Sequence, residues 1–486
     1  MTRNAAKRIS KNTSALFAGM AVNTGLMMVF VIYVARAVGV DHFGQYALAR
    51  HFFELFLGIS TTALAIQVSR RVSEDPTCLG RCLTASLLIA AALTLVSGVI
   101  MVAVCFLFGY SPDTRIVVMA AWVALCPAAI AAVLEAGFVA LEKAEYVMWA
   151  TALSSVIFVG SGMAVVAAGY EVSVIFAGLF LARSVMALFY AVQLRRHDAS
   201  LSWSYDRGYL SDLVSEGKVY ASENWCSTLS NHLDLILLSL FQNEYAVGVY
   251  AAAAKVLRVG AMLATSYTRA IFPYLARLGK ESPEALRRVS EGSVKYMLAM
   301  VLPFVMAVCV MAGRVIEVLY TDTYAEATLV LQILIWVVAI KFINPFLSHA
   351  LFAQQQPAKS LRVAVIRLVS YLALAVILIP KFGAVGAAWT ALAATLTAFC
   401  FYYGWVFHSG EEAAQRSGQG LLGAIGRTLL AAAIAGGLLG LVGDRPAVPF
   451  MAISLVAYVV LLFLFRVVSW NDIRLVYHLR PQRQAD

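Results

Sequence analysis

Three ionisable side chains stand close together in an otherwise apolar stretch near the start of the chain. Arg50, His51 and Glu54 all lie within "FGQYALARHFFELFLG", residues 43–58. Arg50 and Glu54 are four residues apart, so they share one side of a helix. A charged side chain among apolar residues needs an opposite charge or water. We therefore predict that this group faces a hydrated cavity.

A second set of ionisable residues lies near the middle of the chain. Lys255 and Arg258 are three residues apart and share one side of a helix, and Glu223 and Asp234 are separated by eleven residues, about three helical turns. The two carboxylates could equally be buried counter-ions for the two cations. That alternative is compatible with a cavity.

The composition indicates an integral membrane protein. Of 486 residues, 61% are hydrophobic and 13% charged, and the mean hydropathy is +0.80, which is more apolar side chain than a soluble core can hold. The net charge is +10, but the sequence shows no cluster of lysine and arginine on a soluble binding module. We therefore expect no nucleic acid as a partner. The seven cysteines predict no disulfide framework, and the close pair Cys78 and Cys82 lacks the further ligands of a metal site.

The hydropathy pattern predicts an all-α, polytopic fold. A bilayer core needs about 20 apolar residues per helix, which divides the chain into about fourteen spans. We expect these spans at 14–37, 44–68, 83–108, 115–140, 147–168, 173–193, 219–241, 246–275, 296–319, 327–352, 362–380, 384–407, 421–442 and 448–468. We interpret the first as a retained helix rather than a cleaved signal.

The distribution of lysine and arginine between the spans predicts the orientation. With a cytoplasmic N-terminus, the inner segments hold 23 of these residues, and the outer loops hold only Lys381 and Arg445. This alternation follows the positive-inside rule and supports an even number of spans. Both termini are therefore expected in the cytoplasm.

An internal repeat predicts two six-span halves. Residues 43–54 align without gaps with residues 247–258, four of the twelve positions are identical, and Gly44 matches Gly248 at an offset of 204 residues. In this register His51 lies opposite Lys255. Matched halves of this kind are common in transporters, whose substrate site lies between them.

Other interpretations of the same residues remain open. Arg50 and Glu54 could be an i,i+4 ion pair that stabilises their own helix. Arg183 and Lys341 have no charged neighbour in their own spans, and pairing across helices suits them as well as contact with a ligand. His51 could be a packed histidine rather than a proton relay.

Three segments carry a resemblance to a known group: "NTSALFAGMAVNTGLMMVFVIYVARAVGVDHFGQYALARHFFEL", "LDLILLSLFQNEYAVGVYAAAAKVLR" and "IPKFGAVGAAWTALAA". They resemble the polysaccharide-transporter branch of the multidrug/oligosaccharidyl-lipid/polysaccharide exporter superfamily, which includes the O-antigen-type flippases. The resemblance implies two six-helix lobes around a central cavity, as in MATE transporters, and two further helices. The expected parts are an N-terminal lobe (1–195), a cytoplasmic linker (196–218), a C-terminal lobe (219–407), and two helices with a cytoplasmic tail (421–486).

The resemblance also implies a function. Such a protein would carry an undecaprenyl-pyrophosphate-linked oligosaccharide, a repeat unit of O-antigen, capsule or exopolysaccharide, across the bacterial plasma (inner) membrane by alternating access. Cavity arginines and lysines are thought to hold the pyrophosphate, and a guanidinium group is a planar bidentate donor for it. The candidates for substrate binding are Arg50, Lys255, Arg258, Arg183 and Lys341. The candidates for coupling or as counter-ions are His51, Glu54, Glu223 and Asp234.

Two rival functions fit the sequence less well. A drug or cation antiporter of the same superfamily needs acidic cavity residues, and the span 14–37 contains none. A membrane glycosyltransferase or polymerase needs a sizeable extramembrane domain, and every outer loop is shorter than about ten residues. We therefore expect no enzyme, no cofactor and no metal. The expected partners are the lipid-linked oligosaccharide, the bilayer and other polysaccharide-assembly proteins.

Overall fold

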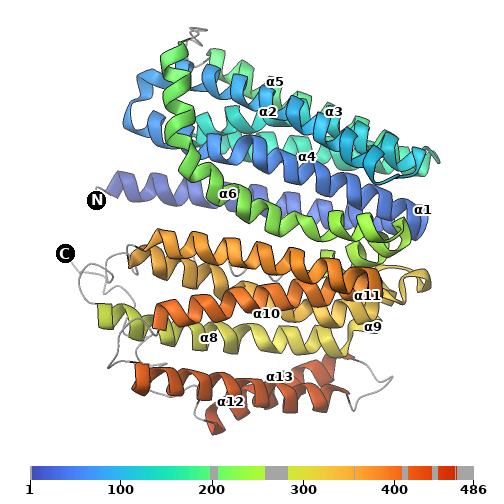
Figure 1. Cartoon of the computed structure of the whole chain (residues 1–486), viewed down its shortest axis with the longest axis vertical. Helices are drawn as coiled ribbons and strands as arrows, with labels where there is room; N and C mark the ends of the chain where they lie inside the picture. Colours follow the sequence, from blue (N-terminus) through green and yellow to red (C-terminus); the bar gives the residue numbers. More distant parts are fainter. Residues whose placement is uncertain are drawn as a thin grey trace. The chain divides into compact units, whose positions relative to one another are not determined.

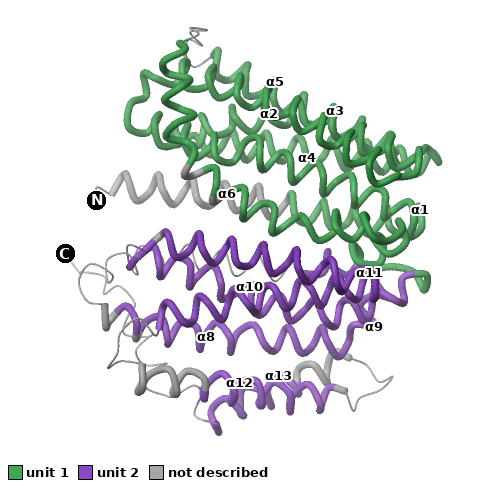
Figure 2. The backbone as a smooth tube through the Cα atoms, in the orientation of Figure 1, with its two compact units in different colours: residues 1–252, 319–323 green, residues 253–318, 324–486 purple. Residues whose placement is uncertain are grey.

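The computed structural model describes residues 3–196, 206–257, 283–354, 356–407, 414–440, 447–465 and 467. Within these ranges every regular element is a helix (Figure 1). The chain forms two compact units, residues 1–252 with 319–323 and residues 253–318 with 324–486 (Figure 2). Each unit is described by itself below.

Among the described residues, the first unit includes six long helices and a short 3-10 helix. They are α1 (Arg3–Glu74), η1 (Pro76–Cys78), α2 (Leu79–Leu107), α3 (Pro112–Ala140), α4 (Ala144–Ala167), α5 (Val172–Arg196) and α6 (Arg207–Phe241). Residues 244–252 of this unit are also helical, and the helix continues through residues 253–257, which belong to the second unit. The helix α6 begins well before the expected span because Asp206 caps it, accepting hydrogen bonds from the backbone N–H groups of Gly208 and Tyr209. Residues 207–218, expected in the linker, are thus helical.

The described helices of the second unit are α8 (Pro283–Val310), α9 (Ala312–Leu319, whose last residue is counted with the first unit), α10 (Ala327–Ala353), α11 (Pro357–Phe407), α12 (Ala414–Gly440) and α13 (Ala447–Leu464). The short helix η2 (Asp322–Tyr324) has two residues in the first unit and one in the second. The predicted spans 327–352 and 448–468 agree with α10 and α13 to within a few residues. The predicted span 296–319 instead covers the C-terminal part of α8, a turn at residue 311 and all of α9. The predicted span 246–275 lies partly outside the described residues. Eight helices in the described ranges are long and apolar enough to cross a membrane. The protein is thus a multi-pass, all-α membrane protein.

Two pairs of predicted spans form single bent helices. The first and second spans both lie in α1, which is interrupted only at Gly39 (φ 79°, ψ 173°). The eleventh and twelfth spans both lie in α11, which is interrupted at Gly383 (φ 55°, ψ −130°). A residue with a side chain rarely adopts these positive φ angles. Glycine therefore permits a change of direction without a loop.

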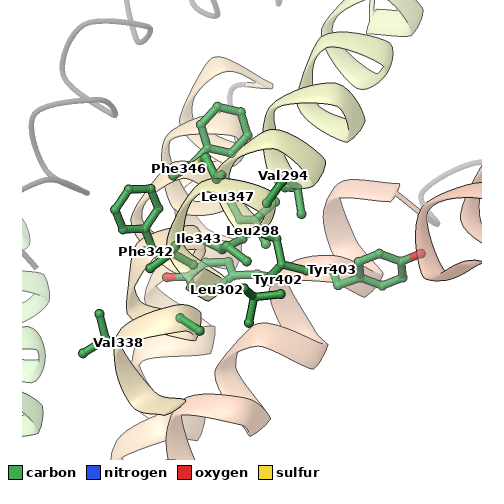
Figure 3. Packing of buried hydrophobic residues seen from close by; sticks show 14 of the residues in the cluster. Val294, Leu298, Leu302, Val338, Phe342, Ile343, Phe346, Leu347, Tyr402 and Tyr403 are labelled. Carbon is green, nitrogen blue, oxygen red and sulfur yellow. The ribbon is translucent and has the colours of Figure 1, made fainter. Parts of the chain in front are cut away.

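Each unit has a hydrophobic core of its own. In the first unit, α1 packs against each of α2 to α6, and the buried rings of Phe138 and Tyr190 lie 5.2 Å apart in its core. In the second unit, α8, α10 and α11 meet around Leu302, Phe342 and Phe346, which are at most 3% exposed (Figure 3). Rigid packing of this kind can fix the positions of polar groups on the same helices.

The two repeat-equivalent glycines pack backbone against backbone. A Cβ on Gly44 would overlap the carbonyl oxygen of Glu244 and would lie 3.0 Å from the backbone nitrogen of Gly248. A Cβ on Gly248 would overlap the carbonyl oxygen of Val40. Small residues allow this close approach of membrane helices. The positions aligned by sequence are therefore in direct contact.

Beside these glycines, Glu244 binds two hydroxyl groups at the start of α3. Its Oε1 accepts hydrogen bonds from Oγ of Ser111 (3.0 Å) and Oγ1 of Thr114 (2.9 Å). Burial by itself would raise the pKa of the Glu244 carboxyl. Hydrogen bonds from its own backbone N–H and from the two hydroxyls outweigh burial and hold this pKa below its ordinary value.

We expect the Glu244→Gln variant to be less stable than wild type at neutral pH, by about 1 kcal/mol. A carboxyl with a lowered pKa stabilises the fold above its unfolded pKa, about 4.3, and this contribution is lost as the pH falls through the native pKa. Melting temperatures measured between pH 7 and pH 3 should converge at the acidic end. The exposed Glu171, changed to Gln, is the control. A difference that stays constant with pH would contradict this role of the charge.

Candidate functional site

Four helices of the first unit bring ionisable side chains together inside the apolar bundle. We call this group the charge cluster, and it consists of Arg50, His51 and Glu54 on α1, Glu135 on α3, Arg183 on α5 and His232 on α6. The bent helix α1 contacts α3, α5 and α6 directly. These contacts place residues that are far apart in sequence within electrostatic range.

Arg50 lies at the centre of the cluster. Its Nε donates a hydrogen bond to Oε1 of Glu54 at 2.9 Å, and its guanidinium carbon lies 5.2 Å from the ring centroid of Phe53 and 5.7 Å from that of Phe158. Arg50 is only 8% exposed, yet its buried Nη1 has no hydrogen-bond partner among the described residues. One N–H donor of this guanidinium is therefore left unsatisfied within the described residues.

Arg183 is the second cation of the cluster. Its Nη1 donates to the Met186 sulfur at 3.4 Å, which is a weak acceptor, and its buried Nε has no hydrogen-bond partner in the described part of the chain. The guanidinium interacts electrostatically with Arg50, Glu135 and Glu54. Two guanidinium groups therefore lie close together in an apolar setting, with their charges balanced by two carboxylates.

Two histidines lie beside the Arg50–Glu54 ion pair. Nδ1 of His51 is 2.9 Å from the carbonyl oxygen of Ala47, so this nitrogen carries the hydrogen and donates it. The His51 ring lies 5.7 Å from the ring of His232. Nδ1 of His232 is 3.9 Å from Oε2 of Glu54, which is beyond hydrogen-bond distance. Glu54 thus lies between a guanidinium group and an imidazole.

The two arginines give the cluster N–H donors that suit an anion. Guanidinium groups offer fixed, paired N–H donors that match phosphate oxygens. In the described residues there is no group of three or more His, Cys, Asp or Glu side chains that could hold a metal ion. A ligand that bound here would replace carboxylate oxygens around arginine with oxygens of its own.

The structure brings four of the predicted site residues together: Arg50, His51, Glu54 and Arg183. The i,i+4 ion pair of Arg50 with Glu54, left open by the sequence, is present. Asp234 accepts a hydrogen bond from the Tyr250 hydroxyl at 3.1 Å.

The other predicted residues lie outside the charge cluster or outside the described part of the chain. Lys255 and Lys341 belong to the second unit and are half-buried. Arg258 and the side chain of Glu223 lie outside the described residues. The functional roles given to all the predicted site residues stay predictions.

Three residues of the site were missed from sequence. Glu135 and His232 belong to the cluster, and the Tyr190 hydroxyl donates to Oε2 of Glu135 at 3.4 Å. One signal could have found Glu135: it is an acidic residue inside the apolar span 115–140, where a carboxylate is costly without a partner. The contact between His232 and Glu54 depends on how α6 packs against α1, which local sequence does not encode.

Comparison with known protein families gives two matches. A family described as "Polysaccharide biosynthesis protein" matches residues 9–279. A second family, "Lipid II flippase MurJ", matches residues 225–461. Together they extend over most of the chain, and the first includes the whole charge cluster.

Individual proteins show the same similarity. A probable low-salt glycan biosynthesis flippase of Haloferax volcanii is 25% identical over 415 residues, 82% of this chain and 83% of that protein. A second probable flippase of the same organism is 22% identical over 78% of this chain and 80% of its own length.

Solved structures share the fold. The lipid II flippase MurJ in an inward closed conformation superposes with a TM-score of 0.75 at 13% identity, covering 94% of this chain and 99% of that one. An inward-facing MATE multidrug transporter superposes with a TM-score of 0.65 at 16% identity, covering 80% of this chain and 98% of that one. The predicted MATE-like fold class is confirmed by these similarities.

Proposed function

Because the chain belongs to the polysaccharide biosynthesis protein family of the multidrug/oligosaccharidyl-lipid/polysaccharide exporter superfamily, we propose that it moves a lipid-linked oligosaccharide across a membrane. Its relatives are described as flippases, which supports a flippase rather than an enzyme. The proposed substrate is an undecaprenyl-pyrophosphate-linked repeat unit of O-antigen, capsule or exopolysaccharide. The proposed location is the bacterial plasma membrane, with both termini in the cytoplasm.

One observation carries the substrate proposal: two arginines lie within electrostatic range of each other inside the apolar bundle, each with a buried N–H group that has no partner in the described structure. An unsatisfied donor in an apolar environment costs about 1 to 3 kcal/mol. A diphosphate has enough oxygens to satisfy both arginines at once. The arginines would therefore recognise the headgroup that every such substrate shares, whichever glycan is attached.

The surrounding carboxylates suit a carrier that must also release its substrate. Glu54 and Glu135 interact with the arginines, so the cluster by itself carries little net charge. A diphosphate competes with these carboxylates for the guanidinium groups instead of meeting bare cations. Binding is then strong enough to capture the headgroup and weak enough to let it go, as transport requires.

The proposed transport cycle is alternating access between an N-terminal lobe (1–195) and a C-terminal lobe (219–407), with residues 421–486 as two added helices and a tail. In this scheme Lys255, Arg258 and Lys341 would contribute charges from the C-terminal lobe. Glu223 and Asp234 would act as their counter-ions. The linker between the lobes would be the segment 196–218. Other polysaccharide-assembly proteins are proposed as partners.

The proposal is tested by deleting the gene and following lipid-linked glycans in the native host. We expect surface glycan to disappear and its lipid-linked precursor to accumulate on the inner leaflet. Plasmid-borne protein should restore export without changing resistance to cationic drugs. Restored drug resistance with no effect on glycan would favour the antiporter instead.

A further inference from the structure

We propose that Glu54 changes its partner from Arg50 to His232 when a diphosphate binds, so that binding takes up one proton on the imidazole. This inference rests on the proposed function, because the diphosphate is the ligand that displaces Glu54. It assigns a role to His232, which the substrate site itself does not use. It also makes the charge cluster the place where proton and substrate binding are linked.

Arg50 and His232 both lie close to the Glu54 carboxylate, one beside each of its oxygens. Oε1 of Glu54 accepts from Arg50 Nε at 2.9 Å, and the other oxygen of the same carboxylate lies 3.9 Å from His232 Nδ1. Closing the second distance to an ordinary hydrogen bond needs a shift of roughly 1 Å. The side chains of Glu54 and His232 are 16% and 21% exposed, so both are sheltered and the imidazole keeps some contact with its surroundings.

Electrostatics gives the exchange its direction. A diphosphate on Arg50 places negative oxygens beside the Glu54 carboxylate, and like charges at this distance repel strongly in an apolar setting. A protonated His232 supplies the opposite charge that Glu54 then needs. Histidine is the side chain that ordinarily gains a proton near neutral pH, so His232 is suited to take up the proton in this step.

The other charged and titratable groups around Glu54 are less suited to become its new partner. They are Tyr46, Arg50 and His51 on α1, Glu135 on α3, and Arg183 and Tyr190 on α5. Arg183 already interacts with Glu135. Nδ1 of His51 donates to the carbonyl oxygen of Ala47, so that nitrogen does not face Glu54. His232 is the group whose Nδ1 faces the second oxygen of Glu54.

Proton linkage follows from the exchange. The bound state holds one more proton than the unbound state, so affinity for the diphosphate increases as the pH falls. The dissociation constant should rise by up to about tenfold per pH unit on the alkaline side. In the His232→Gln protein this pH-dependent component of the affinity should be lost.

The test is calorimetric titration of the purified full-length protein with farnesyl diphosphate, in two buffers that differ in ionisation enthalpy. Wild type should take up close to one proton more per ligand than His232→Gln, a comparison in which the titration of the ligand itself cancels. The control His349→Gln, which changes a histidine of α10, should behave like wild type. Equal proton uptake by wild type and His232→Gln would overturn the exchange and leave the diphosphate site intact. No binding by wild type would overturn the site and the exchange with it.

A second variant tests the same step without altering the imidazole. Glu54→Gln removes the carboxylate that the diphosphate must displace, so this protein should bind farnesyl diphosphate more tightly than wild type. It should also take up no extra proton. Weaker binding by Glu54→Gln would contradict the exchange.

Discussion

The Arg50→Ala variant should abolish surface glycan while the protein remains inserted in the membrane. Arg50 is expected to form charge-assisted hydrogen bonds with the diphosphate, each worth about 1.5 to 3 kcal/mol. The loss of two such bonds weakens binding on the order of 100-fold or more. Glycan on intact cells and protein in the membrane fraction are the two quantities to measure.

Two further variants serve as comparisons for Arg50→Ala. Arg50→Lys keeps the charge but loses the planar fork, so it should export at an intermediate level. Arg36→Ala changes another arginine of α1, whose Nε donates to the Leu319 carbonyl oxygen outside the cluster, and it should export normally. Normal glycan in the Arg50→Ala strain would remove Arg50 from the substrate site.

The Glu135→Ala variant should destabilise the protein strongly. Glu135 interacts electrostatically with Arg183, and an uncompensated cation at the centre of a membrane helix costs about 2.5 to 3.5 kcal/mol. The melting temperature of the solubilised protein and the yield of monodisperse protein should both fall. Glu317→Ala, which removes an exposed carboxylate of α9, should leave them unchanged.

A double variant separates the structural role of this pair from its role in transport. Glu135→Gln combined with Arg183→Gln removes both charges and should recover much of the lost stability. Export should nevertheless stay absent, because Arg183 is proposed to bind the diphosphate. Full export by the stable double variant would show that the pair serves only the fold.

The fold could be predicted from the sequence because the features that determine it are local. Apolar runs of about 20 residues mark membrane helices, and glycine at 39 and 383 permits the bends in α1 and α11. The predicted spans differ from the helices mainly in where they begin and end. The helix α6 begins at Arg207 because Asp206 caps it, and this polar first part lies outside any hydropathy window.

The site could be predicted only in part, because some of its contacts depend on packing between distant helices. The spacing of Arg50 and Glu54 predicts their ion pair, because residues four apart meet on one helix. The approach of Arg183 to Arg50, and of His232 to Glu54, depends on packing between helices that are far apart in sequence. The repeat was a stronger guide than the charges: it paired Gly44 with Gly248, and their backbones are in contact.

The most direct test of the central claim is a structure of the protein bound to farnesyl diphosphate. We expect the diphosphate to lie between the guanidinium groups of Arg50 and Arg183, with Glu54 moved away from Arg50 toward His232. A diphosphate bound elsewhere, with the 2.9 Å contact between Arg50 and Glu54 unchanged, would contradict the assignment of the charge cluster as the substrate site.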